Sequence, residues 1–86
     1  MSAKEMFEEL GLNQVKNSLI DNVLNWNIDY ETNKKYGRYV KVRFHSNKAV
    51  YVSLFDNETG EIGGGLIDVE LHQAITQQMK ELGWIE

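Results

Sequence analysis

The chain has 86 residues, of which 42% are apolar and 26% are charged, a composition typical of one small folded domain. It has no cysteine, which excludes a disulfide framework, a thiol nucleophile and a thiolate metal site. No apolar run is long enough to span a membrane or to form a signal-peptide core, so we expect a single cytoplasmic domain over residues 1–86 and no membrane partner.

The charges are segregated along the chain, which has a formal net charge of −4. Residues 32–55 hold six basic residues and no acid, whereas residues 1–31 and 56–86 are both acidic. A concentration of one charge indicates a surface that could meet a partner, but it does not identify the class of that partner.

A short helix is predicted at the N-terminus. Ser2 and Glu5 have the spacing of a capping box, in which each side chain accepts a hydrogen bond from the other residue's backbone N–H. Gly11 is placed to end the helix in a left-handed conformation. The apolar face of this helix consists of Ala3, Met6, Phe7 and Leu10.

Residues 13–22 fit two patterns. Leu12, Val15 and Leu19 fall on one face of a helix, while Ile20 is in phase with the strand that follows. We predict a short helix or an irregular segment here.

The apolar period then changes to two, which predicts antiparallel strands with one buried and one exposed face. Three strands are expected, over residues 24–30, 39–45 and 50–55. The turn Ser46-Asn47-Lys48 has three residues, so it pairs Phe44 with Val50 and keeps both on one face.

A fourth strand is predicted from Glu61 to Ile67, made irregular by Gly63-Gly64-Gly65. Asp68 then caps a C-terminal helix that Gly83 ends. These elements predict an α+β fold of two layers, in which a three- to four-stranded antiparallel sheet carries the N- and C-terminal helices on one face. The predicted core contains Phe7, Leu10, Trp26, Ile28, Val40, Val42, Phe44, Val50, Val52, Leu54, Leu71, Ile75, Met79 and Leu82.

The other side of the sheet is the candidate interaction face. Aromatic and basic side chains alternating on an open sheet can stack bases and hold phosphates, but tyrosine and arginine are also enriched in the hot spots of protein interfaces. If Tyr30 pairs with Val40, Asp29 faces Lys41 and forms an ordinary cross-strand ion pair. The residues of this face are Tyr39, Lys41, Arg43, His45, Tyr51 and Phe55.

No motif for catalysis or metal binding is present. His45 and His72 are the only histidines, whereas a zinc site needs three or four ligands. The acids that begin at Asp56 fail the calcium-loop pattern, because Gly60 is fifth in place of sixth and Ile67 stands where a glutamate is required. We expect a non-enzymatic protein with no catalytic residue, metal or cofactor.

The two ends of the chain resemble small proteins encoded by phages and prophages of Gram-positive bacteria. The matching segments are Ala3–Gly11, AKEMFEELG, and Lys80–Trp84, KELGW. That group has no established activity, so the resemblance carries over no functional residue. It implies a phage-type accessory protein that works in the host cytoplasm.

We therefore expect an accessory protein that acts by protein–protein interaction through the exposed sheet face, as a monomer or a weak homodimer. Nucleic-acid binding through the same face is the alternative.

Overall fold

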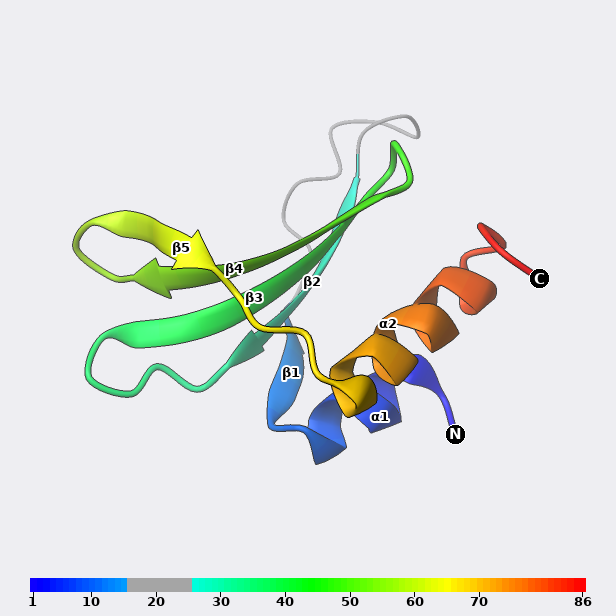
Figure 1. The fold of residues 1–86 in the computed structure, drawn as a ribbon, viewed down its shortest axis with the longest axis horizontal. Coiled ribbons are helices and arrows are strands. Elements are labelled where there is room, and N and C mark those ends of the chain that lie inside the picture. Colours follow the sequence, from blue (N-terminus) through cyan, green and yellow to red (C-terminus); the bar gives the residue numbers. More distant parts are fainter. Residues whose placement is uncertain (16–25) are drawn as a thin grey trace.

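The computed structural model describes residues 1–15 and 26–86 (Figure 1). The strands form one sheet in the order β1-β2-β3-β4-β5, and every neighbouring pair is antiparallel. The elements are α1 Ala3–Glu9, β1 Leu12–Val15, β2 Asn27–Thr32, β3 Arg38–His45, β4 Ala49–Asp56, β5 Gly60–Gly64 and α2 Val69–Glu81.

The predicted α+β class is confirmed, but the described sheet has five strands where three or four were expected. The additional strand is β1, which stands where the beginning of a short helix or irregular segment was predicted. Gly11 has φ 81° and turns the chain back from α1, so that Leu12 pairs with Thr32 and Val15 with Asp29. The remainder of that prediction, residues 16–22, lies outside the described residues.

The fourth predicted strand exists as β5, but it ends at Gly64 and not at Ile67. Its pairing with β4 is irregular between Leu54 and Phe55, as the glycines suggested. Gly65 then donates its N–H to the Val52 carbonyl oxygen at 3.0 Å. A Cβ on Gly65 would lie 2.5 Å from Val52 Cγ1, so this close approach to β4 requires glycine.

The predicted helix caps are all present. Ser2 and Glu5 form the capping box of α1, and Asp68 Oδ1 accepts from the Leu71 N–H at 2.8 Å. At the end of α2 the Trp84 N–H donates to the Met79 carbonyl at 2.9 Å, which with Gly83 at φ 75° forms a Schellman ending. These contacts are local in sequence, and the start of α1 has a long-range cap as well, because the Ala3 N–H donates to Glu81 Oε2 at 2.7 Å.

The core lies between the two helices and one face of the sheet (Figure 1). Most of the predicted core residues are buried or packed against the core, but Trp26, Val40 and Leu54 are outside the core cluster. The helices do not extend over the end of the sheet where β3 begins and β4 ends (Figure 1), and Val40 and Leu54 lie there. The buried apolar residues are Ala3, Phe7, Leu12, Tyr30, Val42, Phe44, Leu71, Ala74 and Ile75.

Tyr30 is a core residue that the prediction did not include. Only 1% of it is exposed, and its hydroxyl donates to Gln78 Oε1 at 2.5 Å, which connects β2 to α2. Burial raises the pKa of Tyr30 to about 12, and the charges of Glu81 and Glu8 act in the same direction.

Val42→Asp should unfold the protein, because Val42 is fully buried and a carboxylate there would have no partner. Val69→Asp is the matched control, since Val69 is 73% exposed and an acid suits the first turn of α2. Circular dichroism and thermal melting of both variants provide the measurement. A folded Val42→Asp variant would contradict the assignment of inner and outer faces.

Tyr30→Phe should alter the alkaline limit of stability. In the unfolded chain the hydroxyl ionises at its ordinary pKa of 10.0, whereas the folded chain keeps it protonated up to about 12. The stabilising effect is therefore complete below pH 10 and is lost as the pH rises to 12. Between these values the free energy of unfolding should fall by on the order of 2 kcal/mol more in the native sequence than in Tyr30→Phe.

The measurement is urea unfolding at pH 9 to 12. Tyr36→Phe is the control, because Tyr36 is 92% exposed, and it should keep the decrease seen in the native sequence. Identical profiles for the native sequence and Tyr30→Phe would refute the effect of burial.

Candidate interaction surface

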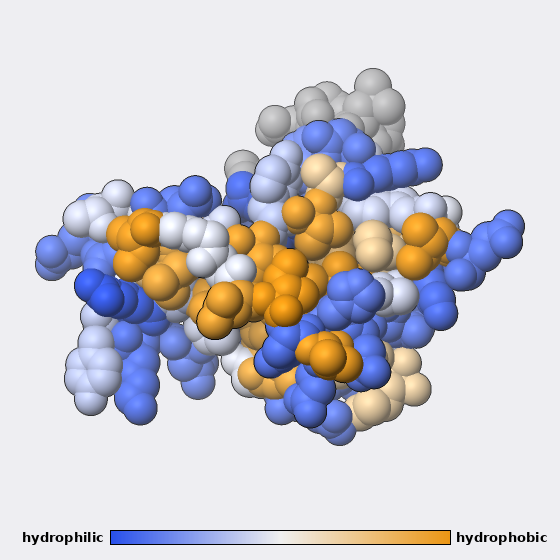
Figure 2. Space-filling view, viewed as in Figure 1, coloured by the Kyte–Doolittle hydropathy of each residue, from blue (hydrophilic) through white to orange (hydrophobic). Residues whose placement is uncertain are grey.

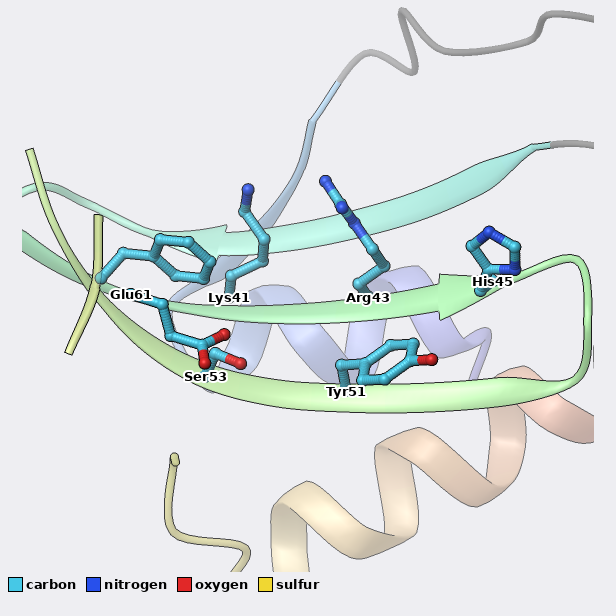
Figure 3. Close-up of a pocket in the computed structure, with 7 residues that line it drawn as sticks. Lys41, Arg43, His45, Tyr51, Ser53 and Glu61 are labelled. Atoms are coloured by element: carbon cyan, nitrogen blue, oxygen red, sulfur yellow. The ribbon is translucent and has the colours of Figure 1, made fainter. Parts of the chain in front are cut away.

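The residues of β3 alternate between the two sides of the sheet. Val42 and Phe44 are buried against the helices, whereas Lys41, Arg43 and His45 point to the opposite side. We call this side the outer face; in Figure 3 Tyr51 and Ser53 of β4 and Glu61 of β5 extend from it too. The predicted residues Tyr39 and Phe55 complete it, because they are paired in register and their rings are in contact.

The pairing of β3 with β4 is as predicted, with Tyr39 opposite Phe55 and Arg43 opposite Tyr51. The expected pairing of β2 with β3 is wrong by two residues, because Tyr30 lies opposite Val42 and not Val40. A shift of two residues keeps every side chain on its predicted face, but it changes the charge partners.

Two cross-strand ion pairs result from this register. Arg43 donates from Nε and Nη2 to the two carboxylate oxygens of Asp29, at 2.9 and 3.0 Å. Lys41 Nζ lies 3.4 Å from Glu31 Oε2, with both side chains less than a fifth exposed. The hydrogen bond to Asp29 also raises the pKa of the Arg43 guanidinium, so Arg43 keeps its charge.

A hollow of about 240 Å³ lies on the outer face between β3, β4 and β5. Figure 3 shows Lys41 and Arg43 extending towards β2, so their charged ends lie away from Ser53 and Tyr51. Glu61 enters the site because β5 places it opposite Phe55, a position that no sequence motif indicated. The hollow is therefore lined by aliphatic stems and aromatic rings, together with the polar side chains of His45, Ser53 and Glu61.

Aromatic rings dominate the end of the outer face near the β2–β3 connection and the β4–β5 turn. Tyr39 and Phe55 stack with their centroids 5.5 Å apart, and Lys41 Nζ lies 4.7 Å from the centroid of Phe55. Lys34 Nζ lies 5.1 Å from the centroid of Tyr39. Tyr51 is 51% exposed and stands apart from the stack. These rings are held in place, which lowers the entropy cost of binding a partner to them.

The charge of the basic segment, residues 32–55, is thus partly neutralised within the protein. Arg38 is paired with Asp56 at 3.5 Å, in addition to the pairs of Lys41 and Arg43. Three of the six bases of residues 32–55 are therefore balanced by acids from β2 and β4. Such a surface attracts a polyanion less than the sequence suggested.

The structure does not assemble a metal site or a membrane span from the residues that it describes. Over residues 1–15 and 26–86, no three histidine or acidic side chains come close enough together to hold a metal ion. His45 accepts a hydrogen bond from the Asn47 N–H at Nδ1, and His72 is exposed on α2. None of the described helices is long and apolar enough to cross a bilayer.

Comparison with known proteins finds no matching family model, no similar curated protein and no similar solved structure. The resemblance of the two ends to phage proteins therefore stays a prediction.

Removing the two acids of β2 should expose the positive charge of the outer face. Asp29→Asn combined with Glu31→Gln leaves Lys41 and Arg43 without their carboxylates. We expect affinity for mixed-sequence single-stranded DNA at low salt to rise by at least about fivefold and to fall steeply with added salt. Fluorescence anisotropy with labelled DNA measures both.

The control is Glu9→Gln with Glu58→Gln, which changes the net charge equally at exposed positions away from the outer face. An equal gain in both double variants would mean that overall charge, and not the ion pairs of the outer face, limits binding of DNA.

Proposed function

We propose that the protein is a non-enzymatic accessory protein that binds a protein partner through the outer face. The observation that carries this proposal is an open sheet surface with a stacked aromatic pair, a half-exposed tyrosine and internally paired charges. Both helices pack on the opposite side of the sheet, against Val42 and Phe44.

The ring contacts support a protein partner. Tyr51 offers a large amphipathic surface at the hollow, and Arg43 on the neighbouring strand is already oriented by Asp29. The oriented Arg43 and the stacked ring of Tyr39 resemble the rigid anchors of protein interfaces, which lose little entropy on binding. The hollow of about 240 Å³ is large enough to accept a side chain of the partner.

The charges favour protein over nucleic acid. A polyanion would have to displace Asp29 and Glu31 to reach Arg43 and Lys41. Nucleic-acid binding stays the second candidate because Lys34 and Lys35 have no ion pair among the described residues and Lys34 lies above Tyr39. The accessory role in a host cytoplasm rests on the resemblance of the chain ends alone.

The test is site-specific photocrosslinking in the cells that naturally make the protein. A photoreactive phenylalanine derivative replaces Tyr51 in one variant and Tyr36, which is 92% exposed in the β2–β3 connection, in the matched control. We expect one predominant protein adduct from position 51 and none of that mass from position 36.

Once the adduct is identified by mass spectrometry, Tyr51→Ala should weaken binding of the purified partner by about tenfold, and Tyr36→Ala should not. An adduct of twice the mass of the protein would identify the partner as a second copy. A nucleic-acid adduct from position 51 would favour the second candidate, and the same adducts from both positions would refute the proposed face.

A further inference from the structure

A second surface, on the helix side of the molecule, has a different character. In the connection from β5 to α2, Leu66 is 94% exposed, Ile67 54% and Val69, at the start of α2, 73%. Figure 2 shows hydrophobic residues continuing from the β4–β5 hairpin along this connection to the beginning of α2. Single exposed apolar side chains are ordinary, but a continuous patch is typical of a binding surface.

Two hollows adjoin the patch, and Leu10 lines both of them. One has a volume of about 190 Å³ and lies between Leu10, Leu66 and the end of the inner face at Val40. The other has a volume of about 370 Å³ and lies between the two helices, beside Met6. Because Leu10 lines both, the two hollows are neighbours at the end of α1 and the beginning of α2. We call the two together the acidic groove.

The charged side chains that line the groove are all acidic, and the positive α-amino group belongs to Met1, which also lines the larger hollow. The acids are Glu9 and Glu70 in the larger hollow and Asp68 in the smaller. The Asp68 carboxylate already accepts a hydrogen bond from the Leu71 N–H as the cap of α2. Glu9 and Glu70 are exposed and make no ion pair with a described residue. An apolar floor between free carboxylates matches a ligand that is apolar on one side and basic along its edges.

We propose that the acidic groove binds a basic amphipathic segment of a partner protein. Apolar side chains of that segment occupy the two hollows and cover Leu66, while its lysines or arginines pair with Glu9 and Glu70. A second copy of this chain fits poorly, since residues 56–86 carry seven acids and one base and would repel their equivalent. The same carboxylates repel an anionic membrane. The proposal does not depend on the outer face.

The probe is a synthetic helical peptide of about 14 residues, or four turns, with leucine along one side and lysine on the other. Its binding is measured by fluorescence anisotropy at low and physiological salt. The peptide control has the same composition with its leucines distributed around the helix. We expect binding at physiological salt by the amphipathic peptide and weaker binding by the control.

Two pairs of protein variants locate the site. Glu70→Lys should weaken binding by about fivefold, whereas Glu58→Lys, an equal charge change in the β4–β5 turn, should change it less than about twofold. Leu66→Ser should weaken binding, whereas Ile85→Ser, at a residue 41% exposed near the C-terminus, should not.

The proposal is overturned if the amphipathic peptide fails to bind at physiological salt or binds no better than its control. It is also overturned if both members of each variant pair weaken peptide binding equally, because such a result would mean that the peptide is attracted to the acidic protein as a whole. Crosslinking from position 51 is independent of these results, so either surface can fail alone.

Discussion

Three aromatic rings connect the elements that the rest of the fold depends on. Phe7 of α1 stacks on Tyr30 of β2 with centroids 4.0 Å apart, and Phe44 of β3 meets both rings edge-on. The Tyr30 hydroxyl then reaches Gln78 in α2. A domain of 86 residues can bury only a modest core, so this cluster supplies much of the contact between sheet and helices. It also decides which side of each strand is left for binding.

The outer face follows from this constraint. Once Tyr30 and Phe44 are turned inward, Asp29 and Arg43 must both point outward, and the register of β2 on β3 places them opposite one another. The resulting two-point hydrogen bond holds the guanidinium in one orientation over β2. Burial on one side of the sheet therefore organises the side chains of the other.

The parts of the fold that depend on neighbouring residues could be predicted from the sequence, as with the Ser2–Glu5 capping box. The β2–β3 register could not, because it depends on a tight turn in which Tyr36, with φ 55°, precedes Gly37, with φ 75°. Tyrosine is rarely found in this conformation, so the sequence did not predict this type of turn or the register that it sets. Strand β1 gave no alternating pattern either, because only Leu12 is buried in it.

The candidate site was predictable to the same extent. Side-chain alternation placed Tyr39, Lys41 and Arg43 together on one face, because parity survives a register shift of two residues. Side-chain alternation could not place Glu61 on this face, because its position beside Phe55 depends on the irregular pairing of β4 with β5. Cross-strand ion pairs on this face were predicted, but which acid pairs with which base depends on the exact register.

Folding also redistributes the charge pattern of the sequence. The basic segment is the most conspicuous feature of the linear chain, yet half of its bases are paired with acids from flanking segments. The acids that remain free include Glu9 and Glu70, which folding brings to the same groove from opposite ends of the chain. The unpaired acids of the folded molecule thus include a pair on the helix side, at the acidic groove. The two proposed surfaces therefore differ in kind: the groove is proposed to select a partner by charge, and the outer face by the shape of its rings and hollow.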